Sequence, residues 1–303
     1  MSNENLPSQL LEKHMRALCL PEPIYIKSED DLFIERTGEV KSAIVFLPKS
    51  KAFINMTLAL ASKMVTEGGT VVLAGANDAG IRSAKAAYER YVGPVSEKII
   101  GNHSALYVGK NARLGADKKV EDFLSFSLIA VAGIKIDAAN LPGVFSAGEL
   151  DEGTKLLLEN IPYDKKTVLD IGCGAGVIGA LYKKKNPESD ITMSDRSKLA
   201  VMASKKTLEK NGLEGKVIES DVFDNIEGAF DLILCNPPFH TGVSTDYSFI
   251  ERFSRDAKKH LNKGGEVWTV ANSFLPYKET LERHIGPTDM IADTDKFRVY
   301  KSK

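Results

Sequence analysis

The sequence predicts an α/β protein of two tandem domains, the second built on a seven-stranded, mostly parallel sheet with a carboxy-terminal antiparallel hairpin. Three observations support this fold class. The chain has 303 residues, more than the roughly 100 to 200 residues of one ordinary core. Its second half alternates short apolar runs with helical segments, as a parallel sheet with right-handed crossovers does. A Gly-Gly strand segment occurs once in each half.

The second half contains five predicted parallel strands with helical segments between them. The run at 230–235 is apolar enough to be buried on both faces of a sheet. Residues 290–292 and 297–300 form the predicted closing hairpin. The predicted strands are 167–171, 190–194, 216–219, 230–235 and 266–271, and the predicted helices are 177–185, 198–211 and 248–261.

The first half is less regular. Residues 131–136 are expected to form one strand that leads out of the domain, and Leu141-Pro142-Gly143 is the expected linker. We therefore divide the chain into domains of residues 1–138 and 139–303. Within the first domain, buried strands are predicted at 43–47 and 70–74, and helices at 51–65 and 81–91.

The two halves share a hint of internal repetition. Residues 67–72 (EGGTVV) resemble residues 263–268 (KGGEVW), and each stretch follows a predicted helix. Duplication of one α/β unit explains this likeness, and so does chance similarity between two strands that begin with Gly-Gly. Because the first half lacks a glycine cluster, we expect no cofactor there.

Composition and charge limit the possible functions. Hydrophobic residues make up 43% and charged residues 27%, and the net charge is −1, so any nucleic-acid contact must come from a local basic patch. The three cysteines form no CxxC pair, which argues against a zinc site and a disulfide framework and fits a reducing cytosol. No apolar run approaches the length of a membrane span, and the first residues are polar. We expect a cytoplasmic protein that needs no membrane and no metal.

Residues 170–176 (DIGCGAG) lie between a predicted strand and a predicted helix. Glycines let a backbone turn sharply and approach a ligand closely, and a helix N-terminus offers unpaired N–H groups. Asp195 ends the next predicted strand, 19 residues after Gly176, which is the spacing at which an acid binds the ribose hydroxyls of an adenosine ligand. The expected cofactor contacts here are Asp170, Gly172, Gly174, Gly176 and Asp195.

The same stretch permits a second interpretation. Residues 174–179 also fit GxGxxG, the fingerprint of dinucleotide-binding proteins, in which Asp195 and Arg196 would meet NAD or NADP. Asp170 favours the form found in S-adenosylmethionine-dependent methyltransferases, but the glycine loop alone leaves both classes open.

Asp221 and Val222 follow the third predicted strand. The Asp221 carboxylate can accept from an adenine amino group while the Val222 backbone N–H meets the ring. An ordinary turn or helix-cap aspartate explains the same pattern.

Asn236 to His240 (NPPFH) follows the buried strand 230–235, at the sheet edge where ligands bind in open α/β folds. The Asn236 carboxamide and the Pro237 carbonyl can accept both hydrogens of an exocyclic amino group, which aims its lone pair at a methyl donor. Phe239 offers a face on which a base can stack. We expect Asn236, Pro237 and Phe239 to be catalytic, with Asn236 also beside the cofactor and His240 either relaying a proton or shaping the pocket. A dehydrogenase has no use for this loop, so the motif favours the methyltransferase.

Residues 236–242 (NPPFHTG) resemble the loop of bacterial 16S rRNA guanine-N2 methyltransferases of the small-subunit methyltransferase C family, which are class I S-adenosylmethionine-dependent enzymes. The likeness covers residues 141–303 well and the first 135 more loosely, through 46–51 and 79–84. One departure is Thr154, where the family usually has serine, and it keeps the hydroxyl. The further similar segments are 143–146, 150–158, 168–176, 260–266, 271–277 and 294–301.

The resemblance implies two tandem Rossmann-like, methyltransferase-type domains, the first degenerate and used for substrate binding or fold support. It implies that S-adenosylmethionine is the methyl donor and that the target is N2 of a guanine in 16S rRNA, guanine 1207 in the usual bacterial numbering. The implied partner is 16S rRNA or the 30S subunit, and a monomer is favoured. The residues implied are Asp170, Gly172, Gly174, Asp195 and Asp221 for the cofactor, with Asn236 and Phe239 holding the base.

Two alternatives stay open. The same loop serves other planar amino groups, namely a guanine N2 of 23S rRNA, adenine N6 or a protein glutamine; Phe239 followed by His240 leans toward guanine. A protein that kept the fold as a non-catalytic RNA-binding or assembly factor is the other alternative. The intact glycine loop and Asn236 loop favour the enzyme.

Overall fold

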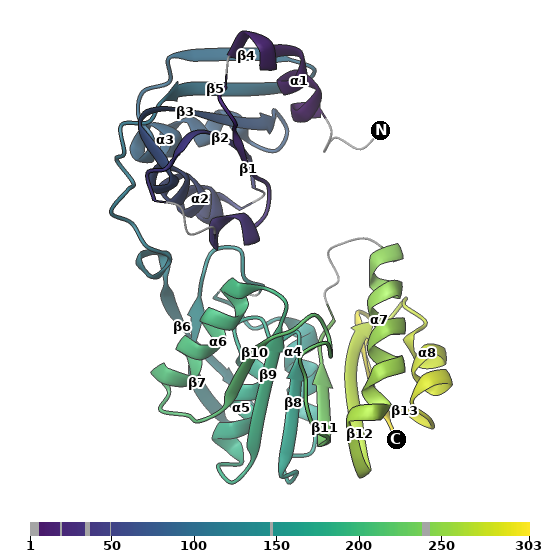
Figure 1. Ribbon diagram of the computed structural model, residues 1–303. Helices are drawn as coiled ribbons and strands as arrows, with labels where there is room; N and C mark the ends of the chain where they lie inside the picture. The colour runs from purple at the N-terminus through teal and green to yellow at the C-terminus, as the bar shows by residue number, and fades with distance from the viewer. Residues whose placement is uncertain (1–5, 19, 34–36, 49, 146–147, 238–242) are drawn as a thin grey trace. The chain divides into compact units, whose positions relative to one another are not determined.

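The computed structural model describes residues 6–18, 20–33, 37–48, 50–145, 148–237 and 243–303 (Figure 1). Contacts divide the chain into two compact units, Met1–Leu124 and Ser125–Lys303.

The second unit is built on a seven-stranded sheet with the strand order β10-β9-β8-β11-β12-β14-β13. The first five strands in this order are parallel, while β14 is antiparallel to β12 and β13 is antiparallel to β14. This confirms the predicted sheet and its closing hairpin. The elements are β6 (Ser125–Val131), β7 (Ile134–Asn140), α4 (Glu152–Asn160), β8 (Thr167–Ile171), α5 (Val177–Lys185), β9 (Asp190–Asp195), α6 (Lys198–Lys210), β10 (Lys216–Glu219), β11 (Phe230–Cys235), α7 (Val243–Ala257), η4 (Lys258–His260), β12 (Leu261–Asn272), α8 (Tyr277–His284), β13 (Thr288–Asp293) and β14 (Phe297–Ser302).

Alternating side chains of the central strands point to opposite faces of this sheet. Leu169 and Ile171 of β8 join a core with Phe253 of α7 and Leu281 of α8. Asp170, between them, points to the other face, where α5 contacts β8 and β9. Helices α5 and α6 therefore lie on one face of the sheet and α7 and α8 on the other (Figure 1). Strand β8 is buried on both faces.

The hairpin β6–β7 differs from the expected single strand over residues 131–136. The chain reverses at Ala132 and Gly133, which have left-handed φ values of 50° and 78°, so that expectation was wrong. The hairpin binds α6 through hydrogen bonds that Ala139 N and Asp137 N donate to side chains of that helix and its C-cap. The predicted domain boundary between residues 138 and 139 falls inside β7, whereas contacts divide the chain before β6.

The first unit has a five-stranded sheet with the order β1-β2-β3-β5-β4. The three strands β1 to β3 are parallel, and β5 and β4 are antiparallel additions. Leu10 and Leu11 of α1 pack on Ile44, Val72 and Leu106 of the sheet. The elements are α1 (Leu6–Leu18), β1 (Ile24–Ile26), η2 (Asp30–Phe33), β2 (Val40–Phe46), α2 (Lys51–Met64), β3 (Val65–Ala76), α3 (Ile81–Tyr91), β4 (Glu97–Gly101), β5 (Ser104–Lys110) and η3 (Val120–Phe123).

The order β1-β2-β3-β5-β4 repeats the half-sheet β8-β11-β12-β14-β13 of the second unit. The repeat extends to an irregularity. Between Val40 and Ser42 of β2 the partner in β3 moves from residue 65 to 70, and between Phe230 and Leu232 of β11 the partner in β12 moves from 261 to 266. In both pairs, a step of two residues along the first strand corresponds to a step of five residues along its partner. This shared irregularity favours duplication of one unit over a chance likeness of the two Gly-Gly segments.

The first unit has no room for the remaining half of that sheet. In the second unit, α5, β9, α6 and β10 lie along the chain between β8 and β11. In the first unit, only residues 27–39 lie between β1 and β2, too few for two helices and two strands. The first unit thus repeats only the half of the fold that contains the antiparallel hairpin.

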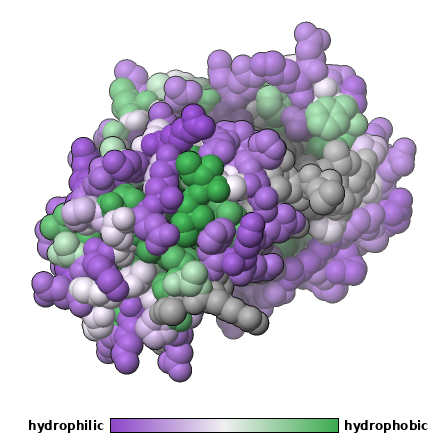
Figure 2. All heavy atoms as spheres, turned by 90° about the horizontal axis from the view of Figure 1, so that it is seen from above, coloured by the Kyte–Doolittle hydropathy of each residue, from purple (hydrophilic) through white to green (hydrophobic). Residues whose placement is uncertain are grey.

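Figure 2 shows hydrophilic residues over most of one face of the molecule, with hydrophobic residues in small separate groups. Tyr25 and Ile100 of the first unit are among the exposed large hydrophobic side chains. Among the described residues, no helix combines the length and the apolarity needed to cross a bilayer.

Candidate functional site

The glycine loop between β8 and α5 takes a left-handed course. Gly172, Gly174 and Gly176 have φ values of 69°, 54° and 76°, a region that side chains disfavour. At Gly176 a side chain is disfavoured for a second reason, the lack of space: a Cβ there would lie 2.9 Å from Oγ of Ser204 and 3.0 Å from its Cα. The loop backbone can therefore lie close to α6.

Helix α6 holds this loop through two buried hydroxyls. Ser204 Oγ donates to the Gly174 carbonyl at 2.9 Å, and Thr207 Oγ1 donates to the Ala175 carbonyl at 2.6 Å. Cys173 Sγ lies 3.2 Å from Ser204 Oγ. Burial raises the pKa of the Cys173 thiol well above its usual range, so the thiol stays protonated and serves packing.

Asp195, at the end of β9, links the glycine loop to the start of α6. Its Oδ2 accepts from Gly174 N at 2.9 Å and its Oδ1 from Ser197 N at 2.9 Å. Burial raises the pKa of Asp195, while these two backbone N–H groups oppose the shift. Each carboxylate oxygen keeps capacity for a further donor, because a carboxylate offers about four lone pairs.

Asp170 lies beneath the loop and does not line its cavity. The side chain is fully buried, and Oδ2 accepts from Gly179 N of α5 at 3.0 Å. Its Oδ1 is buried and has no hydrogen-bond partner among the described residues. Burial raises the pKa of Asp170 to about 7; the Gly179 hydrogen bond lowers it, and the charge of Asp195 raises it further. The side chain thus supports the loop from behind.

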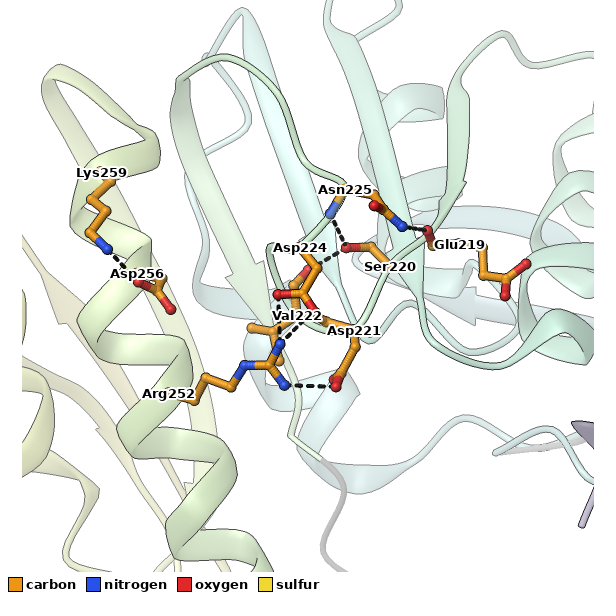
Figure 3. Close-up of polar contacts among 9 residues, drawn as sticks. All are labelled: Glu219, Ser220, Asp221, Val222, Asp224, Asn225, Arg252, Asp256 and Lys259. Atoms are coloured by element: carbon orange, nitrogen blue, oxygen red, sulfur yellow. Dashed lines mark hydrogen bonds and ion pairs between the residues drawn. The ribbon is translucent and has the colours of Figure 1, made fainter.

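Asp221 and Val222 lie in the turn after β10, which docks on β9 because Ser220 N donates to the Asp195 carbonyl at 2.9 Å. Arg252 reaches this turn from α7 (Figure 3). Its guanidinium donates to the Asp221 carboxylate and to Asp224, both at 2.7 Å, and to the Asp221 carbonyl at 3.1 Å. Val222 has a left-handed φ of 55°, which is strained for a β-branched residue, and Arg252 and Ser220 hold the turn in that shape.

Asn236, directly after β11, is bound by residues from the start of α4. Its Nδ2 donates to Asp151 Oδ2 at 3.0 Å and to Thr154 Oγ1 at 2.8 Å. Its Oδ1 is buried and has no hydrogen-bond partner among the described residues. An unpaired buried acceptor costs about 1–3 kcal/mol, so a ligand that donated a hydrogen bond to this amide oxygen would relieve that cost.

One cavity collects several of these residues. Gly172, Gly174 and Asn236 line it together with Thr154 and Phe145. Pro237 is buried beside Asn236, whereas Pro238, Phe239 and His240 lie outside the described residues. In the described part of the chain, no group of three or more histidine, cysteine or acidic side chains is placed to hold a metal ion. The cavity brings the glycine loop next to the Asn236 carboxamide, whose oxygen has no hydrogen-bond partner among the described residues, and this arrangement suits a ligand beside an amino group.

The structure also brings in residues that the sequence did not single out for the site: Asp151, Thr154, Ser204, Thr207 and Arg252. One signal was available. Asp151 stands three residues before Thr154, the spacing of a helix N-cap, and its side chain does accept from Thr154 N. Nothing local indicates that Asp151 also reaches Asn236, 85 residues later.

The chain matches two families and several relatives. Residues 135–301 match the methyltransferase small domain, and residues 24–127 match the N-terminal methyltransferase small domain. The chain is 39% identical over 271 residues to ribosomal RNA small subunit methyltransferase C of Haemophilus influenzae, covering 89% of this chain and 81% of that protein. It is 39% identical over 259 residues to the protein of the same name from Pseudoalteromonas atlantica, covering 85% and 76%.

Among solved structures, the fold resembles the T. thermophilus 16S rRNA N2 G1207 methyltransferase in complex with AdoMet and guanosine. The TM-score is 0.76 at 23% identity, and the match covers 88% of this chain and 74% of that one. This likeness extends over both units and confirms two methyltransferase-type domains in tandem.

Proposed function

This chain belongs to the ribosomal RNA small subunit methyltransferase C family, and we propose that it transfers a methyl group from S-adenosylmethionine to N2 of a guanine in 16S rRNA. One observation supports this most directly. The Asn236 carboxamide has both hydrogens engaged, its oxygen has no partner among the described residues, and it lines the same cavity as the glycine loop. An acceptor in that position fits an amino group that must approach a methyl donor.

The proposed cofactor contacts come from the glycine loop after β8 and from the carboxyl ends of β9 and β10. The backbone at Gly172 and Gly174 lines the cavity: among the described residues, a Cβ at Gly172 would meet no atom within 4 Å, and one at Gly174 would meet only Phe145, at 3.8 to 4.0 Å. Asp195 would accept from the ribose hydroxyls, and Asp221 with the Val222 N–H would meet the adenine. Gly176 and Asp170 would act through the loop, Gly176 by its close contact with Ser204 and Asp170 by its bond to Gly179.

Asn236 and Pro237 would prepare the target nitrogen. The lone pair of guanine N2 is delocalised into the ring, and two acceptors on its hydrogens, Asn236 Oδ1 and the Pro237 carbonyl, draw it toward a tetrahedral form. S-adenosylmethionine supplies a sulfonium-activated methyl group: N2 forms the new N–C bond, the C–S bond breaks toward sulfur, and one N2 proton leaves to solvent. Phe239 would stack on the base and His240 would shape the pocket.

The partner we propose is 16S rRNA, free or within the 30S subunit, with the guanine named for the T. thermophilus relative as the expected position. The enzyme would act as a monomer in the cytoplasm and without a metal. Because the net charge is −1, binding to rRNA would depend on local basic groups.

The test is a labelling experiment. The protein is incubated with tritiated S-adenosylmethionine and, in separate reactions, 30S subunits, naked 16S rRNA, 50S subunits and ribosomal protein, and the label is mapped. We expect label on a guanine N2 of 16S rRNA. Label on 23S rRNA, on adenine N6 or on a glutamine would reassign the substrate, and no transfer together with no cofactor binding by calorimetry would refute the enzyme.

Asn236→Ala tests the role of the loop. It should leave the calorimetric Kd for S-adenosylmethionine nearly unchanged and lower kcat by about 10²-fold, the usual effect of losing one transition-state hydrogen bond. Wild-type methylation by this variant would show that Asn236 does not hold the target.

A further inference from the structure

The contacts of Asn236 specify which way its carboxamide faces. A carboxamide has two N–H donors on one side and one carbonyl acceptor on the other. Both donors are used, one by Asp151 Oδ2 at 3.0 Å and one by Thr154 Oγ1 at 2.8 Å. The carbonyl oxygen is left buried without a partner among the described residues.

Asp151 makes this orientation the favoured one. An ionised carboxylate only accepts hydrogen bonds, so a flipped amide would set the Asn236 oxygen against the Asp151 oxygen. The flip would exchange a charge-assisted hydrogen bond for a repulsion between two acceptors. Thr154 alone would not decide the matter, because a hydroxyl can donate as well as accept.

Helix α4 holds Asp151 in place. Asp151 is the N-cap of this helix, and the same Oδ2 that meets Asn236 accepts from Thr154 N at 2.8 Å. A helix N-terminus stabilises a negative group. Gly153 leaves the carboxylate room, since a Cβ there would lie 3.1 Å from that oxygen and 3.2 Å from the ring of Phe297.

We infer that Asp151 and Thr154 are positioning residues that fix the Asn236 carboxamide with its oxygen toward the amino group that receives the methyl. The inference rests on the proposed methyl transfer and adds a basis for its selectivity. An acceptor held in this direction binds a group with hydrogens, such as N2 of guanine, and repels a ring carbonyl. A carboxamide free to flip would offer donors as often and would lose that choice.

Substitutions at Thr154 give the clearest test of this inference. Thr154→Val keeps the shape and the backbone N–H that binds Asp151 but removes the hydroxyl acceptor. Thr154→Ser keeps the hydroxyl and should behave like the wild type. Glu152→Gln is the matched control, since this neighbour in the first turn of α4 pairs only with the exposed Lys296 among the contacts described.

Kinetics should show a selective loss. We expect Thr154→Val to lower kcat about fivefold to tenfold and Asp151→Ala about 10- to 100-fold, with the Kd for S-adenosylmethionine within about twofold of wild type. In the Asn236→Ala background, Thr154→Val should have no further effect, because its role passes through Asn236. A further loss in that background would overturn the inference.

The carboxamide itself can be observed without any substrate. In 15N-labelled protein, the Asn236 side-chain N–H₂ signals are identified by their absence in Asn236→Ala. Thr154→Val should shift one of the two signals and speed its exchange with solvent, while Thr154→Ser and Glu152→Gln leave both unchanged. Circular dichroism checks that each variant is folded, and Asp151→Ala, which removes the other acceptor of the Asn236 N–H₂ group, provides the same test if valine is not tolerated at position 154.

The outcomes separate the two proposals. Wild-type kcat and unmoved Asn236 signals in Thr154→Val would overturn the positioning role. A wild-type protein that leaves 16S rRNA unlabelled would overturn the proposed function, yet the spectra of the free protein would still decide which way the carboxamide faces.

Discussion

Asp170 lies fully buried beneath the glycine loop, with one carboxylate oxygen on Gly179 N and the other without a partner among the described residues. Burial of this kind disfavours the charged form, and the pKa of Asp170 rises to about 7 from an ordinary value of 3.8. Below pH 3.8 the carboxyl is protonated in both the folded and the unfolded chain. Between the two values only the folded chain holds the proton, so Asp170 makes the stability fall as pH rises toward 7.

Asp170→Asn removes this titration while keeping an oxygen for Gly179. Relative to this variant, we expect the wild-type free energy of unfolding to fall by up to about 1.4 kcal/mol per pH unit between pH 4.5 and 6.5, and to level off above about pH 7.5. Urea denaturation of both proteins at four pH values measures the difference. A difference independent of pH would show that Asp170 does not titrate in this range.

Single residues of the site were predictable where the signal is local. Gly176 lies in the loop after β8, Asp195 is the last residue of β9 and Asn236 directly follows β11, so all three lie at the carboxyl edge of the sheet. The groups that fix them were not predictable. Asp151 meets Asn236 across 85 residues, and Arg252 meets Asp221 across 31, so only the folded topology brings them together.

At the scale of elements, the buried strands were predicted best. The segments 167–171, 216–219 and 230–235 have the same bounds in β8, β10 and β11. Strand β12 was expected over 266–271 but extends from Leu261 to Asn272, because Leu261 already pairs with Phe230 before a register shift with β11 that skips residues 262–265. The three-residue strand β1 and the hairpin β4–β5 were not predicted, although β5 contains the apolar run 105–108.

Strand β12 contains a buried hydroxyl group at Thr269. Thr269 is fully buried, and its hydroxyl has no hydrogen-bond partner among the described residues. Thr269→Val removes the hydroxyl at equal shape and should stabilise the protein by about 1 kcal/mol. The matched control is Thr288→Val in β13, which leaves the buried Ser302 hydroxyl, 2.8 Å away, without its partner and should destabilise by a similar amount. Thermal melts giving both changes the same sign would contradict this account.

At the scale of the whole molecule, the duplication explains why the two units differ. The first unit repeats β8-β11-β12-β14-β13 and lacks counterparts of α5, β9, α6 and β10, the elements that hold the glycine loop and Asp195. Every described residue proposed to contact the cofactor therefore lies in the second unit. The repeat of Gly-Gly segments suggested a duplication, but which half was kept depends on strand order, which a sequence does not state.

The single tryptophan allows a test of this division. Trp268 lies buried in β12, so its fluorescence reports the second unit alone. S-adenosylmethionine at about 100 times its Kd should raise the free energy of the unfolding that Trp268 reports by about 2.7 kcal/mol. Hydrogen exchange at amides of β3 in the first unit should change much less. Equal protection of both units would show that the cofactor acts on the whole chain.

The strand order also sets a sequence of events during synthesis. β14 is the last of the seven strands to be translated, yet it lies inside the sheet, between β12 and β13. Until residues 297–302 leave the ribosome, one edge of β12 has no partner strand, and this strand contains the apolar residues Val267, Trp268 and Val270. An unpaired apolar edge of this kind can pair with strands of other chains. A nascent chain that already contains Asn236 and the glycine loop must therefore wait for β14 before its sheet is complete, and this interval is when it is most exposed to aggregation.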